Sequence, residues 1–140
     1  MIEYYKQKNI FDKQLELYVQ SLTSDMYVKN ILFDAIQSGK RIRPIIVMEM
    51  TEFILQKPME DFSLAIAIEL IHNASLILDD MPMMDNDKYR RGKHTLHYKY
   101  NEKIALFIAD LFLNESSTLI DNYLKTYTNN HEKQSKVYSF

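Results

Sequence analysis

Residues 75–95 read SLILDDMPMMDNDKYRRGKHT, and the fold and chemistry expected of the chain follow from this stretch. It begins as an apolar run, continues through four aspartates at positions 79, 80, 85 and 87, and ends shortly after two adjacent arginines. Carboxylates a few ångströms apart raise each other's pKa, so a cluster of this kind needs cations to stay ionised. The stretch therefore predicts a cation-binding site at the end of an apolar helix.

The aspartates favour a hard metal ion as one of these cations. The chain has no cysteine, and an all-oxygen cluster suits magnesium, which is bound by one or two carboxylates together with water and phosphate oxygens. On an unbroken helix Asp79 and Asp85 would point about 120° apart. Pro82 should break the helix between them and let both face one cavity. Taken alone, the aspartates are equally consistent with a solvated acidic turn.

Two groups of cationic side chains accompany the aspartates. Arg90 and Arg91 follow them directly, while Lys40 and Arg43 lie in SGKRIRP, residues 38–44, beside an expected helix start. Guanidinium groups match phosphate oxygens, and helix N-termini favour anions. Two cationic groups and one magnesium-type cluster together suggest two polyphosphate ligands. Alone, the KRIR segment would more simply be a solvated surface patch.

His72 belongs to the same apolar run as the aspartates. It lies seven residues before Asp79, about two helical turns, and so on the same helix face. It is therefore expected to line the same cavity. A hydrogen-bonded core histidine is the alternative for His72 considered alone.

Around this stretch the sequence indicates one helical domain. The 140 residues contain only two glycines and three prolines, a scarcity that favours long helices over many short strands. Apolar residues recur at spacings of three and four, and Ser38-Gly39 should end the second helix. The almost entirely apolar helix that begins at Pro44 should be buried on most sides. The predicted helices cover residues 10–22, 28–36, 44–55, 62–78 and 99–127, with a bend near Asn114 in the last and a polar tail over 128–140.

Composition argues against several functional classes. A net charge of −2 with nearly balanced acidic and basic residues gives no general attraction for nucleic acid. The most apolar run, residues 64–78, is too short and too polar for a stable membrane span. The N-terminal residues MIEYYKQKNIF lack the features of a signal peptide. We therefore expect a cytoplasmic protein.

Two segments resemble a known family. GKRIRP, residues 39–44, and ELIHNASLILDDMPMMDNDKYRRGK, residues 69–93, are similar in order and spacing to the N-terminal half of trans-isoprenyl diphosphate synthases. These enzymes form the polyprenyl synthetase family, which includes farnesyl and geranylgeranyl diphosphate synthases. The resemblance extends over about residues 37 to 113 and implies an all-α isoprenoid synthase bundle. It also implies head-to-tail condensation of isopentenyl diphosphate with an allylic diphosphate, with Mg²⁺ as the cofactor.

The resemblance assigns a role to each matching position. The catalytic residues would be the magnesium ligands of the first aspartate-rich motif and an arginine at the allylic diphosphate: Asp79, Asp80, Asp85 and Arg90. The diphosphate of isopentenyl diphosphate would be bound by Lys40, Arg43, His72 and Arg91. Small residues at Ala74 and Ser75, five and four positions before the first aspartate, imply an open hydrocarbon pocket and a product of geranylgeranyl length or longer.

The family's second aspartate-rich motif is not found in these 140 residues. The resemblance therefore implies that the chain alone has incomplete activity, and three interpretations remain open. The chain is a fragment of an ordinary synthase, a small subunit that associates with a longer synthase, or a helical protein with a non-enzymatic interaction role. In each case unpartnered apolar faces on the 44–55 helix and the helix from Leu64 predict a homo- or hetero-oligomer.

Overall fold

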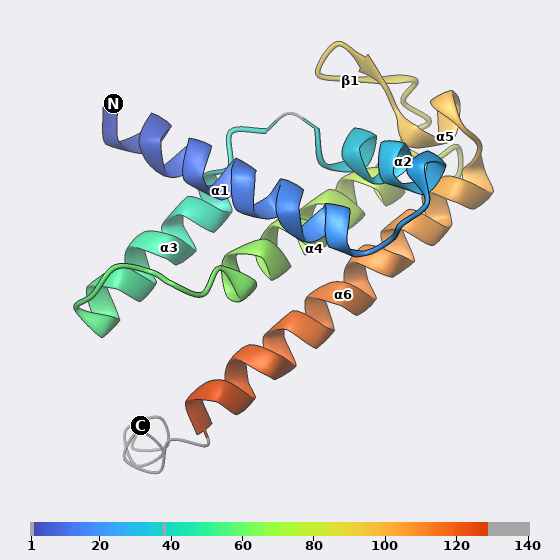
Figure 1. The fold of residues 1–140 in the computed structure, drawn as a ribbon. Helices are drawn as coiled ribbons and strands as arrows, with labels where there is room; N and C mark the ends of the chain where they lie inside the picture. Colours follow the sequence, from blue (N-terminus) through green and yellow to red (C-terminus); the bar gives the residue numbers. More distant parts are fainter. Residues whose placement is uncertain (1, 38, 129–140) are drawn as a thin grey trace.

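The computed structural model describes residues 2–37 and 39–128, and this part of the chain is almost entirely helical. Figure 1 shows α4 in the middle, with α6 and α3 packed against it and α1 crossing over it. The predicted all-α fold is confirmed. The elements are α1 (Ile2–Ser21), α2 (Met26–Ile36), α3 (Ile42–Leu55), α4 (Ser63–Asp79), β1 (Tyr89–Arg90), β2 (Lys93–His94), α5 (Leu96–Lys99) and α6 (Glu102–Thr128).

Local chemistry explains where the helices begin and end. Asp25 caps α2, because its side chain accepts a hydrogen bond of 2.9 Å from the backbone N–H of Val28. Pro44 lies in the first turn of α3, where its missing N–H removes no helical hydrogen bond. Helix α4 ends at Asp79, as expected from Pro82 three residues later. Helix α2 ends at Ile36 and is followed by an extended Gln37, earlier than the predicted end at Ser38-Gly39.

The core lies where α1, α2, α4 and α6 meet. Its largest fully buried side chains include Phe11, Leu15, Leu32, Leu70 and Phe112. Small, fully buried side chains on the two most extensively packed helices allow their axes to approach closely; these are Ala65, Ala67 and Ala74 of α4 and Ala105 and Ala109 of α6. This packing fixes α4, which carries His72 and Asp79 of the predicted site, relative to α6.

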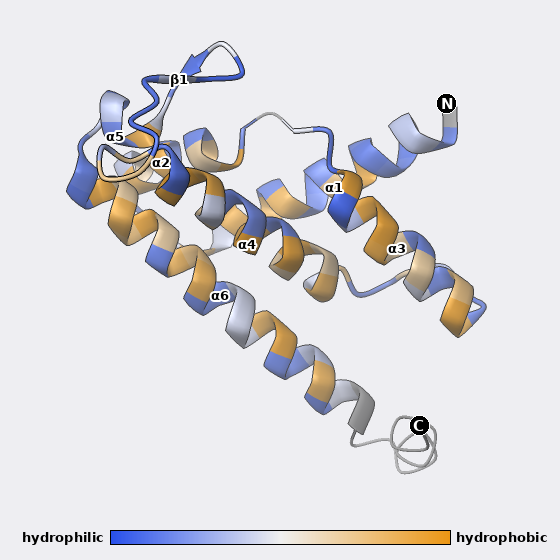
Figure 2. Cartoon of the chain, turned by 180° about the vertical axis from the view of Figure 1, so that it is seen from behind, coloured by the Kyte–Doolittle hydropathy of each residue, from blue (hydrophilic) through white to orange (hydrophobic). Residues whose placement is uncertain are grey.

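Helix α3 differs from its predicted burial. Only Pro44, Ile45 and Met48 are buried. The helix exposes an apolar surface, which we call the α3 outer face, made of Ile42, Ile46, Met50, Phe53 and Ile54. Figure 2 shows this helix as strongly hydrophobic. The prediction of burial on most sides is therefore wrong, and the exposed apolar face expected for residues 44–55 is present.

Helix α6 is continuous through Asn114, where the sequence suggested a bend. The Asn114 side-chain amide donates a 2.9 Å hydrogen bond to the carbonyl of Asp110 within the same helix. Helix α6 ends at Thr128, so residues 129–140 of the predicted polar tail lie outside the described residues. In the described ranges 2–37 and 39–128, no helix has both the length and the apolar character needed to cross a membrane.

Candidate active site

A short hairpin carries the two adjacent arginines. Strands β1 and β2 are antiparallel, with Tyr89 opposite His94 and Arg90 opposite Lys93. Arg91 and Gly92 form the two-residue turn, with φ of 52° and 78°, as in the type I′ turns that suit tight hairpins. Arg90 lies in the strand and Arg91 in the turn. The two neighbouring arginines therefore leave the hairpin from different backbone positions.

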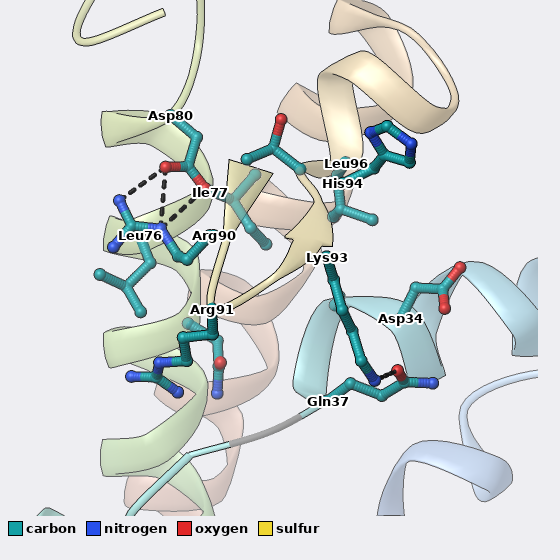
Figure 3. Close-up of a pocket in the computed structure, with 13 residues that line it drawn as sticks. Asp34, Gln37, Leu76, Ile77, Asp80, Arg90, Arg91, Lys93, His94 and Leu96 are labelled. Carbon is teal, nitrogen blue, oxygen red and sulfur yellow. Dashed lines mark hydrogen bonds and ion pairs between the residues drawn. The ribbon is translucent and has the colours of Figure 1, made fainter. Parts of the chain in front are cut away.

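Arg90 forms a bidentate ion pair with Asp80 at the end of α4 (Figure 3). Its Nε lies 2.8 and 3.0 Å from Oδ1 and Oδ2 of Asp80, and its Nη2 lies 2.6 Å from Oδ1. This hydrogen bonding, helped by the charges of Asp80, Asp87 and Asp79, raises the pKa of Arg90 against the opposing effect of burial. The Asp80 carboxylate is itself buried. Arg90 is thus a fixed cation anchored to the aspartate segment.

The aspartate segment folds back over the end of α4. The backbone N–H of Asp85 donates to the carbonyl of Asp79 at 2.9 Å, and that of Asp87 donates to the carbonyl of Asp80 at 3.1 Å. The helix break before Pro82 thus places the backbone of Asp85 beside that of Asp79. The side chains do not form a ready cage, because no group of three or more acidic, histidine or cysteine side chains within residues 2–37 and 39–128 could hold a metal ion.

The donor chemistry of these aspartates nevertheless fits magnesium. Asp79 is half-buried and Asp85 is exposed, so both carboxylates are accessible. Magnesium in proteins uses only one or two carboxylates and completes its shell with water and phosphate oxygens. A preformed cage of three carboxylates is therefore not required. The assignment of Asp79, Asp80 and Asp85 as ligands stays a prediction.

Four further predicted residues meet in a single cavity of about 460 Å³, which we call the cationic cavity. Its lining comes from the loop before α3, from α3 and α4, and from the hairpin turn. It contains all four residues predicted for the second diphosphate. The complete lining is Gly39, Lys40, Arg41, Ile42, Arg43, Glu69, His72 and Arg91. Cations from distant parts of the sequence thus converge on a space large enough for a small anion.

The sequence model of the family described as polyprenyl synthetase matches residues 25–139. The chain belongs to the polyprenyl synthetase family. It is 36% identical over 118 residues to farnesyl diphosphate synthase of Bacillus subtilis, covering 84% of this chain and 40% of that protein. It is 37% identical over 109 residues to geranylgeranyl diphosphate synthase of Cyanophora paradoxa, covering 78% of this chain and 36% of that one.

Solved structures agree with this assignment. The geranyltranstransferase of Thermotoga maritima superposes with a TM-score of 0.77 at 30% identity, covering 96% of this chain and 50% of that one. The polyprenyl synthetase chain described here therefore spans half or less of these relatives' length. Its relatives are prenyltransferases, and its fold is that of the N-terminal part of these enzymes.

His72 of this polyprenyl synthetase lines the cationic cavity and is only partly buried. Burial lowers its pKa, and so do the nearby charges of Arg43, Arg91 and Arg41, while Glu69 opposes them. The imidazole is therefore neutral at pH 7, because the ordinary histidine pKa is about 6.5. Its place on the cavity wall excludes the alternative of an enclosed core histidine.

The two residues predicted to set product length have different surroundings. Ala74 is fully buried in the core, whereas Ser75 is exposed and donates a 2.8 Å hydrogen bond to the carbonyl of His72. Neighbours on a helix point about 100° apart, so only one of the two can lie on a given face. Of this pair, Ser75 alone lies on the exposed face of α4 that leads to Asp79. The assignment of Ala74 and Ser75 to a chain-length pocket stays a prediction.

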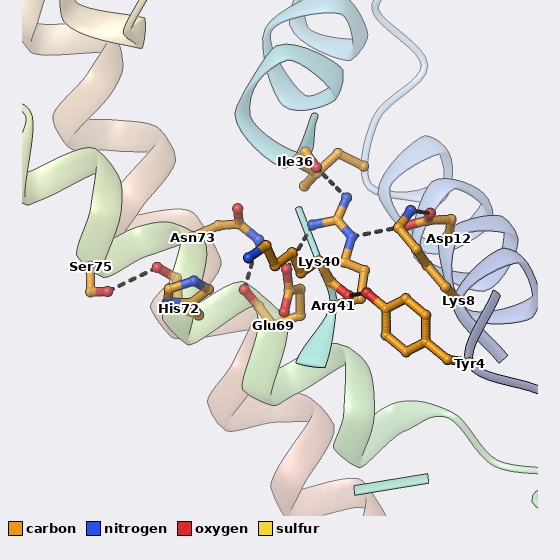
Figure 4. Close-up of polar contacts among 10 residues, drawn as sticks. All are labelled: Tyr4, Lys8, Asp12, Ile36, Lys40, Arg41, Glu69, His72, Asn73 and Ser75. Atoms are coloured by element: carbon orange, nitrogen blue, oxygen red, sulfur yellow. Dashed lines mark hydrogen bonds and ion pairs between the residues drawn. The ribbon is translucent and has the colours of Figure 1, made fainter. Parts of the chain in front are cut away.

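Sequence reasoning missed the role of Arg41. It lies inside KRIR, and the sequence gives no reason to separate it from Lys40 and Arg43. In this polyprenyl synthetase its side chain is buried among Asp12, Ile36 and Glu69 (Figure 4). A signal existed in Glu69, since a carboxylate within an apolar helix is rarely buried without a paired cation.

Proposed function

We propose that this chain supplies the N-terminal part of a prenyltransferase site that joins isopentenyl diphosphate to an allylic diphosphate in a head-to-tail condensation. The observation that supports this most strongly is the cationic cavity. Lys40, Arg43, His72 and Arg91 come from separate elements and line one space, which is the arrangement that a diphosphate requires.

In this proposal the isopentenyl diphosphate occupies the cationic cavity. Its diphosphate carries several negative charges, and Lys40, Arg43 and Arg91 supply the opposing positive ones. Arginine forks match phosphate oxygens in pairs, while lysine acts as a point charge. Neutral His72 is able to donate one hydrogen bond without adding to the charge. These residues would hold the diphosphate while leaving its hydrocarbon end outside the cavity.

The allylic diphosphate would lie at the other group of charges, beside Arg90 and the aspartates. Magnesium held by Asp79, Asp80 and Asp85 would supply charge neutralisation for the departing pyrophosphate. Arg90, fixed in position by Asp80, would stabilise the same developing negative charge as the allylic carbon–oxygen bond breaks. The isopentenyl double bond would then attack the allylic carbon, and loss of a proton would complete the product.

The relatives' names support the reaction class, and the chain's shorter span leaves its own activity as part of the proposal. We expect the 140-residue chain to bind diphosphate but to turn over poorly by itself, because it covers at most half of these relatives. Ser75 is small, so any elongated product should reach geranylgeranyl length or more. The cytoplasmic location expected from the sequence stays a prediction.

Binding of inorganic pyrophosphate by titration calorimetry tests the proposal without requiring turnover. Lys40→Met and Arg43→Met should each weaken binding about tenfold, since each removes one charge from the cavity wall. Lys103→Met, which removes an exposed lysine from α6, is the matched control and should leave binding unchanged. Equal binding by all four proteins would refute the assignment of the cavity.

A second measurement addresses the reaction. The purified chain is incubated with magnesium, isopentenyl diphosphate and dimethylallyl, geranyl or farnesyl diphosphate, and products are separated by chromatography. Weak or absent turnover together with pyrophosphate binding would agree with an incomplete prenyltransferase site. Full turnover by the chain alone would show that our expectation of incomplete activity is wrong, and its products would test the predicted length.

A further inference from the structure

We propose that Arg41 is a positioning residue that acts through Glu69: it holds the Glu69 carboxylate in an internal ion pair, so that the cavity wall presents cations to a bound diphosphate. This inference rests on the proposed diphosphate function of the cationic cavity. It assigns to Arg41 a task different from that of its neighbours Lys40 and Arg43, which would contact the diphosphate directly.

The guanidinium group of Arg41 is bound on three sides by the protein. Nε donates to Oδ1 of Asp12 at 2.8 Å, and Nη1 donates to Oε1 of Glu69 at 2.6 Å. Nη2 donates to the backbone carbonyl of Ile36 at 2.6 Å. These acceptors belong to α1, α4 and the last residue of α2. Only 6% of Arg41 is exposed, so its side chain interacts with the protein interior rather than with solvent.

The backbone of Arg41 is strained, and its side-chain contacts hold it in this conformation. Its φ of 53° and ψ of 32° are left-handed, a conformation that costs a non-glycine residue about 1–2 kcal/mol. Helix α3 begins immediately after it, with the Ile45 N–H bonded to the Arg41 carbonyl at 3.2 Å. The Tyr4 hydroxyl also donates to the carbonyl of Lys40. The ion pairs of Arg41 with Asp12 and Glu69 and its hydrogen bond to the Ile36 carbonyl offset this strain.

Glu69 is the reason that the cavity needs this arrangement. It is one of the cavity-lining residues, and only 3% of it is exposed. An unpaired carboxylate at this position would repel a diphosphate and would be costly to bury. Burial lowers the pKa of Arg41, but the hydrogen bonds and negative charges of Asp12 and Glu69 together outweigh burial, so the net shift is upward. The Arg41 cation is therefore permanent, and it cancels the one carboxylate in the cavity wall.

Gly39 shows how closely Arg41 is fitted to the cavity. A Cβ atom added to Gly39 would lie 3.0 Å from Nη1 of Arg41 and also 3.0 Å from Nη1 of Arg91. The loop before α3 is thus close to both Arg41 and Arg91 at Gly39. A side chain at position 39 would therefore require both guanidinium groups to shift.

The test compares Arg41→Met, Glu69→Gln and the double variant by pyrophosphate calorimetry, with Lys103→Met as the control for loss of a distant charge. We expect Arg41→Met to weaken binding about tenfold, because it leaves Glu69 unpaired. We expect Glu69→Gln to bind as tightly as the wild type or severalfold more tightly, since it removes a negative charge. The double variant should recover to within about threefold of the wild type.

A second readout does not depend on ligand binding. The pKa of His72, followed by NMR, should rise in Arg41→Met and fall in Glu69→Gln, because the net charge beside the imidazole changes in opposite directions. If Arg41→Met does not fold, Glu69→Gln and the double variant still decide the matter. Weaker binding by Glu69→Gln, or a double variant as weak as Arg41→Met, would overturn the inference.

The same measurements separate this inference from the proposed function. If the wild-type chain fails to bind pyrophosphate, the diphosphate assignment of the cavity is wrong, while the His72 titrations still report whether Arg41 controls the charge of Glu69. If the wild type binds and Arg41→Met binds equally well, the inference alone fails.

Discussion

The charged residues around the cationic cavity act on the pKa of His72. Its pKa is lowered by burial and by Arg43, Arg91 and Arg41, with Glu69 acting in the opposite direction. A bound pyrophosphate brings negative charge close to the ring and should raise this pKa. We predict proton uptake on binding and tighter binding as the pH falls from about 7.5 towards 6.

NMR titration of the His72 ring with and without pyrophosphate measures this effect. His72→Gln, which keeps a hydrogen-bonding side chain but cannot titrate, should remove the proton uptake. A ring pKa that stays the same on addition of pyrophosphate would place the ligand elsewhere. Protonation of His72 has the opposite effect on the stability of the unliganded fold. The pKa of His72 is lower in the folded chain than in the unfolded chain, so the unfolded chain binds the proton more readily. His72 therefore destabilises the fold as the pH drops below about 6.5.

Much of the site could be predicted at the level of single residues, because charged types at fixed spacing carry the signal. Lys40, Arg43, His72 and Arg91 do line one cavity. The left-handed backbone of Arg41 could not be predicted, since a left-handed arginine has no sequence signature comparable to glycine. Glu69 indicated that some cation is buried beside it, but not which one. The pairing of Asp80 with Arg90 was also unforeseen, because it depends on the short hairpin that carries Arg90 back to the end of α4.

Helices α4 and α6 are the pair on which the fold depends most, and α6 offers a matched comparison. Phe112 is fully buried, whereas Phe107, on the same helix, is 72% exposed. Phe112→Ala should lower the free energy of unfolding by about 3–5 kcal/mol through lost burial and a cavity. Phe107→Ala should change it by about 0.5 kcal/mol or less.

Urea denaturation followed by circular dichroism measures both values. The same chemical change at the two sites controls for helix propensity, so the difference between the variants reports burial alone. Similar losses for the two variants would mean that Phe107 is covered in solution, for example by association of the chain.

At the level of elements, the spacing of apolar residues predicted the five long helices α1, α2, α3, α4 and α6. It did not predict the short elements β1, β2 and α5. Strands of two residues are too short to show alternation, and the Arg91-Gly92 turn lacks the usual Asn-Gly signal. The sequence predicted too much burial for α3, because apolar residues occur on nearly all of its sides. Their pattern therefore does not show which face points to solvent. Asn114 suggested a bend, but its side chain bonds within α6.

For the whole molecule, the α3 outer face predicts association. Ile46 and Phe53 are 56% and 71% exposed, and contiguous apolar surface of this kind is unusual in a stable monomer. We expect the purified chain to form oligomers in sedimentation velocity experiments. Ile46→Lys with Phe53→Lys should shift it towards the monomer.

Asn30→Lys, at an exposed position on α2, is the control for added positive charge and should leave the oligomers unchanged. A wild-type chain that sediments as a monomer across the concentration range would contradict the prediction. A longer polyprenyl synthetase chain that suppresses the association when mixed with this one would identify the occupant of the face.

The contacts of Arg41 also bear on the order in which the molecule is assembled. They join positions 28 and 29 residues apart in the sequence, whereas each helix needs only contacts within a few residues. Long-range contacts of this kind form after local ones during folding. A chain can therefore have its full helical content and still lack the finished cavity. Circular dichroism would report such a chain as folded, and only ligand binding would show that the site had not yet formed.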